Sequence, residues 1–247
     1  MIDIKRITIS PDGTHHLLDD KPMYLKRFLS VLKFHEPNLA PVKDESGAYH
    51  IDTGGRACYK ERYLSTFGFY CLKAAIKSDS GWFHIFPDGK RVYKQNFKWC
   101  GNYQENLCVV CDNNTNYFHI NSNGNAIYNN RYEYAGDFKD GIAAVQLNGK
   151  YSHIDKIGNF IHNKWFLDLD VYHKNFARAK DEEGWFHLDI RGNAAYPLRF
   201  KTIENFYNGY ARVEDNYGNI FIINEIGETA NTLRDRLYHD VEPVQSS

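Results

Sequence analysis

The sequence contains no long hydrophobic run. No stretch of its 247 residues approaches the about eighteen consecutive apolar residues that a membrane span requires. The first ten residues, MIDIKRITIS, also lack the apolar core of a signal peptide. We therefore expect a soluble protein of the cytoplasm.

Neither sign of charge is in excess. Lys and Arg total 30, Asp and Glu total 31, and the formal net charge is −1. No basic run is present that would neutralise phosphates or dock on a membrane surface. The sequence therefore predicts neither a nucleic-acid partner nor a membrane partner, and it leaves the oligomeric state open.

Cysteine and methionine are scarce, whereas aromatic residues are abundant. The five cysteines are an odd number without a secretion signal, so free thiols are expected rather than a disulfide framework. Methionine occurs only twice, against 18 Tyr, 16 Phe and 4 Trp. Many small β units, each with a wide flat side chain, would produce this bias, so long helices are not expected.

Histidine recurs at a nearly constant interval. The steps between consecutive members of the series are 34, 34, 35, 34 and 34 residues, and Phe221 occupies the next place. The series comprises His16, His50, His84, His119, His153 and His187. A fixed period of this size is the signature of a tandem-repeat fold. The sequence therefore predicts about seven repeats of roughly 34 residues.

Other positions keep the same step and define the strands of each repeat. Ten residues before the histidine lies a small residue, and a β-branched residue follows two positions later, as at Ala74 and Ile76. This spacing predicts a half-buried first strand. A glycine turn then leads to a second strand that reads aromatic, aromatic, His, Ile, and a second glycine turn leads to a tyrosine column. That column comprises Tyr59, Tyr93, Tyr128 and Tyr196. Three strands are expected in each repeat, with a fourth left open.

The predicted fold is all-β. Seven repeats favour closure into a seven-bladed, propeller-like ring, whereas roughly 34 residues is short for four strands and favours an open β-solenoid of hairpin repeats. The ring is the prediction, and the solenoid is its alternative. Residues 1–235 are expected to form a single repeat domain. Residues 236–247 are polar, include Pro243, and are expected to be a flexible C-terminal tail.

The Gly-Trp-Phe-His steps at residues 81–84 and 184–187 resemble the bacterial WG, or KWG, β-repeat family. The resemblance extends over about residues 4–233, which is nearly the whole chain. It implies an interaction scaffold without a catalytic activity common to the family.

Two patterns that can bind metal are interpreted as structural. Equivalent histidines of neighbouring repeats would lie about 4.7 to 10 Å apart in stacked β structure, whereas zinc ligands lie about 2.0 to 2.1 Å from one ion. We expect each histidine to bond a turn carbonyl or the Asp two residues on, as at Asp52, Asp155 and Asp189. Cys108 and Cys111 form a C-x-x-C pattern inside a strand, where positions i and i+3 point to opposite faces. No metal or cofactor is predicted.

No local catalytic signature accompanies the repeats. Nucleophile-elbow, phosphate-loop and dinucleotide-binding motifs do not occur, and the glycines are interpreted as hairpin turns. The chain is therefore predicted to be no enzyme but a binding or scaffold protein that presents a repeat-built surface to a protein or peptide. The alternative is a lectin-like or small-molecule-binding protein, or an enzyme, with a pocket lined by Tyr and Trp. Exposed aromatic rings beside carboxylates in a pocket would favour that alternative, and a broad shallow groove would favour the scaffold.

Five residues are candidates for binding. Trp82 and Trp185 begin the aromatic run of a second strand. Trp165, Asp168 and Asp170 belong to residues 162–171, a bulky acidic stretch that interrupts the period. A departure from the repeat consensus is where a repeat protein would place a specific contact, and drift that packing tolerates is the competing interpretation.

Overall fold

The computed structural model describes residues 3–235, which consist almost entirely of short antiparallel strands. Within these residues the one helical element is a 3-10 turn, η1 (Ile4–Arg6), and the strands form seven small sheets. The predicted all-β repeat fold is confirmed, and closure into a ring stays a prediction. The predicted C-terminal tail, residues 236–247, lies outside the described residues.

No helix within residues 3–235 is long and apolar enough to cross a bilayer.

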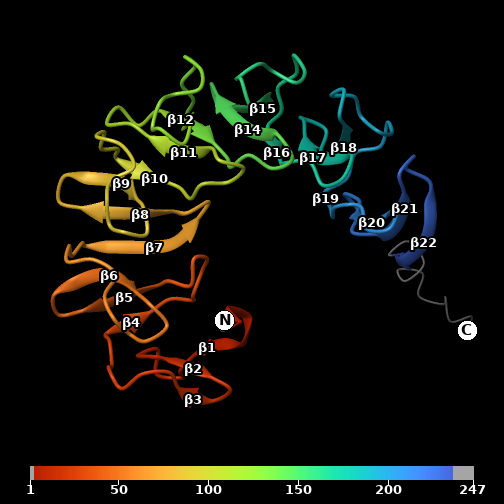
Figure 1. The fold of residues 1–247 in the computed structure, drawn as a ribbon. Coiled ribbons are helices and arrows are strands. Elements are labelled where there is room, and N and C mark those ends of the chain that lie inside the picture. The colour runs from red at the N-terminus through yellow and green to blue at the C-terminus, as the bar shows by residue number, and fades with distance from the viewer. Residues whose placement is uncertain (1–2, 236–247) are drawn as a thin grey trace, which may run out of the picture. The chain divides into compact units, whose positions relative to one another are not determined.

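The chain divides into two compact units, Met1–Phe138 and Lys139–Ser247. The strands of the first unit are β1 (Ile7–Ile9), β2 (His16–Leu18), β3 (Lys21–Pro22), β4 (Ser30–Val31), β5 (Ala40–Asp44), β6 (Gly47–Ile51), β7 (Ser65–Tyr70), β8 (Lys73–Ser78), β9 (Gly81–Ile85), β10 (Trp99–Cys100), β11 (Cys108–Cys111), β12 (Tyr117–Ile120) and β13 (Tyr134–Ala135). Its sheets β1-β2-β3, β4-β5-β6, β7-β8-β9 and β10-β11-β12 follow one another in chain order (Figure 1).

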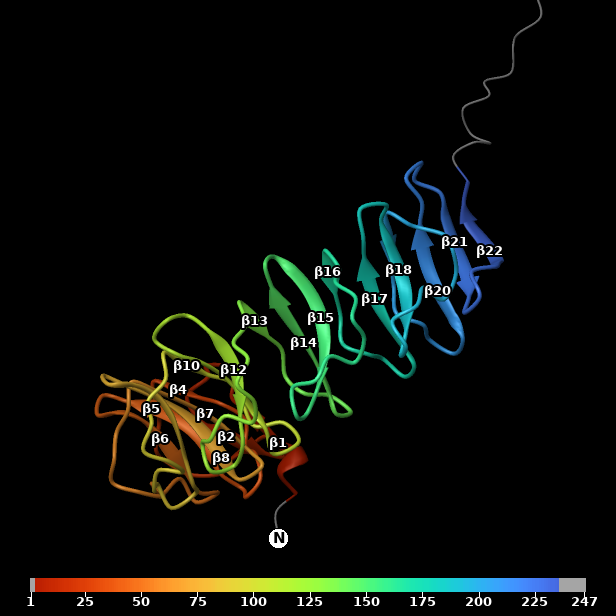
Figure 2. The same ribbon diagram turned by 90° about the horizontal axis from the view of Figure 1, so that it is seen from above.

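The second unit repeats this plan. Its strands are β14 (Ile142–Leu147), β15 (Lys150–Asp155), β16 (Asp168–Leu169), β17 (Phe176–Lys180), β18 (Trp185–Asp189), β19 (Thr202–Ile203), β20 (Tyr210–Glu214), β21 (Ile220–Asn224) and β22 (Thr229–Arg234). The hairpin β14-β15 is followed by the sheets β16-β17-β18 and β19-β20-β21-β22, which lie in chain order (Figure 2).

Each sheet combines a hairpin with a further strand that precedes it or, in the first sheet, follows it. This further strand has two residues, except that β7 has six. In the sheet β4-β5-β6, Ala40 pairs with Ile51 across the hairpin and Ser30 pairs with Lys43. The segment after the second glycine turn makes isolated bridges to the second strand, such as that between Ala48 and Tyr63. The fourth strand left open by the sequence is therefore reduced to such bridges, except in the last sheet, where β22 is a full strand.

The first strand of the hairpin differs in burial along the chain, and β14 of the second unit, with Ala143, Ala144 and Val145 all buried, resembles the strands of the first unit. In β8 and β11 of the first unit, consecutive residues are buried on both faces. In β17 of the second unit, buried Ala177 and Ala179 alternate with half-buried neighbours. The predicted half-buried strand is therefore correct for β17 and β20 and wrong for β8, β11 and β14, where both faces of the strand are covered.

The histidine column links consecutive sheets by hydrogen bonds. His84 Nε2 lies 2.9 Å from the carbonyl oxygen of Gly101, and its Nδ1 lies 2.6 Å from the hydroxyl of Tyr93. Because a carbonyl oxygen only accepts, Nε2 carries the proton and Nδ1 accepts from the tyrosine. The same two kinds of bond occur at His16, His50, His119 and His187. The tyrosine column therefore binds the histidine column.

The aspartates two residues after these histidines have a different task. Asp189 Oδ1 accepts the backbone N–H groups of Arg191 at 2.9 Å and Asn193 at 2.7 Å, which closes the second turn. The predicted bond between histidine and aspartate is therefore wrong, and the carbonyl partner comes from the next sheet rather than from a turn. Burial lowers the pKa of both His84 and His187 to about 4, so both imidazoles are neutral at pH 7.

The arginines that follow the tyrosine column lie against aromatic rings. The guanidinium of Arg131 is 3.8 Å from the ring centre of Phe118, and Arg199 is 3.9 Å from that of Phe186. Arg199 also donates to Asp181 at 2.8 Å. These arginines cover the second strand by cation–π contacts and add to the packing of the sheets.

Candidate functional site

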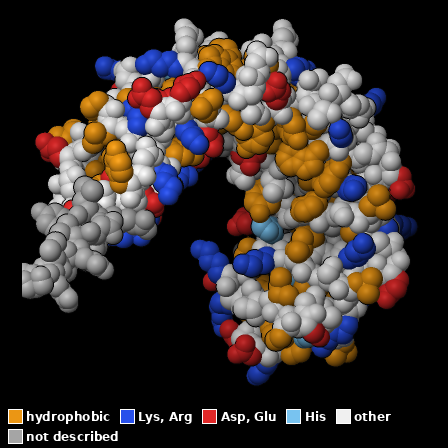
Figure 3. Space-filling model, turned by 180° about the vertical axis from the view of Figure 1, so that it is seen from behind, with side chains coloured by type: hydrophobic (Ala, Val, Ile, Leu, Met, Phe, Trp, Pro, Cys, Tyr) orange, Lys and Arg blue, Asp and Glu red, His pale blue; other side chains and the backbone are white. Residues whose placement is uncertain are grey.

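Aromatic side chains that the histidine network does not use reach the surface of the first unit. Strand alternation buries Phe118 in β12 and leaves Tyr117 half-buried. In β10 it buries Cys100 and leaves Trp99 38% exposed, and Tyr134 of β13 is 45% exposed. Figure 3 shows hydrophobic side chains gathered on the exposed surface of this unit.

Three of these rings border one hollow, which we call the aromatic hollow. Its volume is about 290 Å³, and its lining comprises Trp99, Val109, Tyr117, Tyr134, Ala135, Gly136 and Asp137. The ring centre of Tyr117 lies 6.2 Å from that of Trp99 and 6.3 Å from that of Tyr134. Both distances are typical of aromatic contacts, so the three rings form one continuous surface.

Small residues allow this arrangement. Cys111 lies in register between Trp99 and Tyr117 on the intervening strand, and its short side chain lets the two rings meet above it. Gly101 faces the indole: a Cβ there would lie 3.1 Å from Trp99 Cη2 and 3.0 Å from Val109 Cγ1. A side chain at Gly101 would therefore require Val109 or the tryptophan ring to shift.

Asp137 supplies the one charged side chain in the lining of the aromatic hollow. It keeps contact with solvent, yet the surrounding protein atoms desolvate its carboxyl and raise its pKa above the ordinary value. Among the described residues, no basic side chain forms an ion pair with it. The aromatic hollow therefore combines three ring faces with an uncompensated acidic group.

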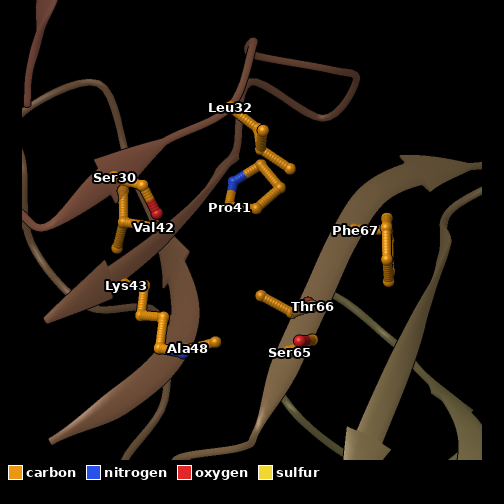
Figure 4. A pocket seen from close by; sticks show the side chains of 9 residues that line it. All are labelled: Ser30, Leu32, Pro41, Val42, Lys43, Ala48, Ser65, Thr66 and Phe67. Atoms are coloured by element: carbon orange, nitrogen blue, oxygen red, sulfur yellow. The ribbon is translucent and has the colours of Figure 1, made fainter. Parts of the chain in front are cut away.

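A second hollow lies elsewhere in the first unit, and we call it the aliphatic hollow. Its volume is about 200 Å³, and its lining comprises Ser30, Leu32, Pro41, Val42, Lys43, Ala48, Ser65, Thr66 and Phe67. Figure 4 shows that the last three residues come from the neighbouring strand β7, which forms the opposite wall. Its lining contains no carboxylate.

The two hollows occupy the same place in the repeat. Ala48 and Tyr117 both lie two residues before the column histidine. Ser65 and Tyr134 both lie fifteen residues after it, in the strand that forms the opposite wall. The repeat therefore produces a hollow between consecutive strands of the first unit, and the residues at these positions decide whether it is aliphatic or aromatic.

In the second unit, an arginine occupies the corresponding region and joins two of the predicted residues. Arg178 forms an ion pair with Asp170 at 2.5 Å and donates to the carbonyl oxygen of Ile203 at 3.0 Å. Its guanidinium is 5.8 Å from the ring centre of Trp185. The structure thus brings Asp170 and Trp185 together through Arg178, and both take part in internal contacts.

Of the other predicted residues, Asp168 borders this cluster, whereas Trp165 and Trp82 make other contacts. Asp168 is exposed and pairs in register with Lys180, whose amino group is 5.8 Å from the Trp185 ring. Trp165 packs edge to face on Phe160 at 5.2 Å. Trp82, in the first unit, stacks on Phe67 at 5.6 Å. A binding role for the five residues stays a prediction.

Sequence reasoning missed the aromatic hollow, although a signal was present. Trp99 and Tyr134 occupy the column fifteen residues after the histidine, where Ser65 and Thr202 show that a small polar residue suffices. Bulky aromatic residues at a position that packing does not require indicate another purpose. Asp137 left no such signal, because its meaning depends on the rings that surround it.

The cysteines and histidines of residues 3–235 form no cluster that could hold a metal ion by three or more ligands. All five cysteines are free thiols, as expected. Cys108 and Cys111 both lie in β11 and are buried, as the strand interpretation of the C-x-x-C pattern requires. Cys108 Sγ lies 3.4 Å from the carbonyl oxygen of Gly101.

Comparison with known proteins identifies the type of repeat in two stretches of the chain. A family model described as WG containing repeat matches residues 119–151 and 188–218. These two stretches are WG repeats. The resemblance stated from the sequence is thereby confirmed at these two stretches. No curated protein matches the chain.

Solved structures with similar folds share little sequence with the chain. A eukaryotic initiation factor superposes with a TM-score of 0.57 at 10% identity, covering 92% of this chain and 72% of that one. BamB from Moraxella catarrhalis superposes with a TM-score of 0.49 at 13% identity, covering 94% of this chain and 85% of that one. At 10% identity, the likeness of this chain to the initiation factor concerns the fold alone.

Proposed function

We propose that the chain is a non-catalytic binding protein that presents the surface of its first unit to a protein or peptide. The recurrence of one hollow at equivalent places of the repeat carries this proposal. An extended partner can place side chains in hollows that recur along a repeat surface. Exposed Trp99 and Tyr134 agree with it, because Trp and Tyr are enriched at protein interfaces.

The size of the hollows also favours a macromolecular partner. Their volumes of about 200 and 290 Å³ lie below and at the lower end of the range of roughly 300 to 1,000 Å³ that encloses most small ligands. A side chain of a bound protein needs less enclosure, because the rest of the interface excludes water around it.

Site-specific photo-cross-linking in the native cell tests the proposal. A benzophenone amino acid in place of Tyr134 is expected to give an adduct of defined mass. The same replacement of Tyr217, which is 78% exposed in the second unit, is the matched control. Absence of an adduct at position 134, or equal adducts at both positions, would contradict the proposal.

A second candidate function is the binding of a neutral glycan. One observation favours it: aromatic rings and a carboxylate, Asp137, lie together in the aromatic hollow. Titration with a panel of neutral oligosaccharides, followed by the indole N–H signal of Trp99 in NMR spectra, separates the two candidates. Saturable shifts that disappear in Trp99→Ala would establish the glycan; the protein-binding proposal predicts none.

A further inference from the structure

The acidic group of the aromatic hollow has no counter-charge. Asp137 lines the aromatic hollow together with Trp99, Tyr117 and Tyr134. Within the described residues its carboxylate accepts no hydrogen bond and forms no ion pair. Asp137 is exposed, so water hydrates its carboxylate in the free protein and a bound cation could reach it. The hollow therefore offers a cation a carboxylate that no other group of the protein neutralises.

The rings and the carboxylate require the same kind of ligand. The face of an aromatic ring carries negative electrostatic potential and attracts a cation, most strongly at tryptophan. The remaining lining, Val109, Ala135 and Gly136, contributes no side-chain hydrogen-bonding group to orient a neutral polar ligand. The ring faces and the carboxylate of the aromatic hollow thus both favour positive charge on an apolar stem.

The aliphatic hollow provides an internal contrast. It occupies the same place in the repeat, but Lys43 is its one charged lining residue and Gly68 stands where Asp137 stands in the aromatic hollow. The carboxylate is therefore a property of one hollow and not of the repeat. The scaffold does not need it for packing.

We propose that the aromatic hollow binds the side chain of a lysine or arginine presented by the partner protein. The proposal rests on the proposed protein-binding function and names the chemistry of one anchor. The alkyl stem lies along the rings and the charged group lies beside Asp137. An apolar side chain of equal length fits the same space but gains nothing from the carboxylate.

Two model compounds isolate the contribution of the charge. N-acetyl-lysine-N-methylamide carries the ammonium group, and N-acetyl-norleucine-N-methylamide has a similar stem without it. Each is titrated into the full chain while the indole N–H signal of Trp99, assigned with Trp99→Phe, is followed by NMR. We expect saturable shifts with the lysine compound and about tenfold weaker binding of the norleucine compound.

Variants then locate the charge effect. Asp137→Asn is expected to lower the affinity for the lysine compound about tenfold, to the level of norleucine. Asp140→Asn removes the same charge three residues along the chain and is expected to leave the affinity unchanged. Unshifted indole signals of the other three tryptophans show that each variant is folded.

The proposal is overturned if both compounds bind equally well, or if Asp137→Asn retains wild-type affinity for the lysine compound. The result is separable from the photo-cross-linking test. An adduct at position 134 without lysine selectivity removes the cationic anchor and leaves the protein-binding function. Lysine selectivity without an adduct removes the protein-binding function and leaves the cation-binding property of the aromatic hollow.

Discussion

A substitution in the tyrosine column shows how the hydrogen-bond network works at the scale of single residues. His162 stands where other repeats have the tyrosine that donates to the column histidine. Its Nε2 lies 3.2 Å from Nδ1 of His153. His153 Nε2 donates to the carbonyl oxygen of Asp170 at 2.8 Å, so its Nδ1 must accept. His162 therefore donates from Nε2, and its own Nδ1 is left buried without a partner.

Restoring the tyrosine is expected to stabilise the protein. In His162→Tyr, a hydroxyl would donate to His153, and no acceptor would remain buried and unpaired. The free energy of unfolding should rise by about 1 kcal/mol, the typical cost of an unsatisfied buried group. Denaturant midpoints measure the change.

The reverse exchange at the equivalent position is the control. Tyr196→His should lower the free energy of unfolding by about the same amount, because it creates the unpaired nitrogen beside His187. Equal losses from both exchanges would show that the tyrosine hydroxyl is not what matters.

The histidine column should make stability fall as the pH is lowered. Burial holds the folded pKa of His84 and His187 at about 4, below the unfolded value of about 6.5. Their contribution is therefore full above pH 6.5 and is lost as the pH falls towards 4, because the unfolded chain takes up protons first.

Alanine variants test this linkage. His84→Ala and His187→Ala are each expected to lower the free energy of unfolding by about 1 to 3 kcal/mol at pH 7.5. The loss should shrink by about 1 kcal/mol at pH 5.5. The bond from His187 to Asp189 that the sequence allowed would raise the pKa of the imidazole and give the opposite pH dependence, but that carboxylate binds the turn. A loss at His187 that grows at low pH would restore the original interpretation.

At the scale of elements, the second glycine turn connects one repeat to the next. The turn of one repeat packs on the tyrosine of the repeat before it. A Cβ on Gly124 would lie 2.5 Å from Tyr93 Cγ, and a Cβ on Gly89 would lie 2.7 Å from Tyr59 Cγ. Glycine is required there both for its positive φ and for this close approach.

Two alanine variants separate these requirements. Gly124 has φ +81° and contacts Tyr93, whereas Gly209 has φ +82° and would place its Cβ in open space. Gly209→Ala should cost about 1 to 2 kcal/mol of unfolding free energy from backbone strain alone. Gly124→Ala should cost at least about 1 kcal/mol more, because tyrosine must also shift. Similar losses in thermal or denaturant unfolding would mean that the turn tolerates the methyl group.

The elements were largely predictable, and their partners were not. Period and alternation located the hairpin strands, the glycine turns and the tyrosine column, because local sequence determines these features. The partners of the histidines depend on how sheets stack: His84 bonds Gly101, seventeen residues away in the next sheet. In the sequence, Asp189 was the more obvious partner for His187 because it is only two residues away. The structure shows that the Asp189 carboxylate instead accepts hydrogen bonds from the backbone of its own turn.

At the scale of the whole molecule, the repeats supply a frame, and the positions outside it supply the candidate function. The histidine, tyrosine and glycine columns determine packing within each compact unit. Trp99, Tyr134 and Asp137 lie outside those columns, so the sequence did not assign them a role. The sequence singled out residues 162–171 as a place for a specific contact with a partner. Two of these residues, His162 and Asp170, make contacts within the protein.

The central claim is that the rings of the aromatic hollow serve binding rather than folding. Tyr134→Ser tests it most directly, because Ser65 occupies the equivalent position in the aliphatic hollow. We predict that the variant changes the free energy of unfolding by about 1 kcal/mol or less, as at an ordinary surface position. A loss of about 2 kcal/mol or more would contradict the account, since the ring would then be part of the core.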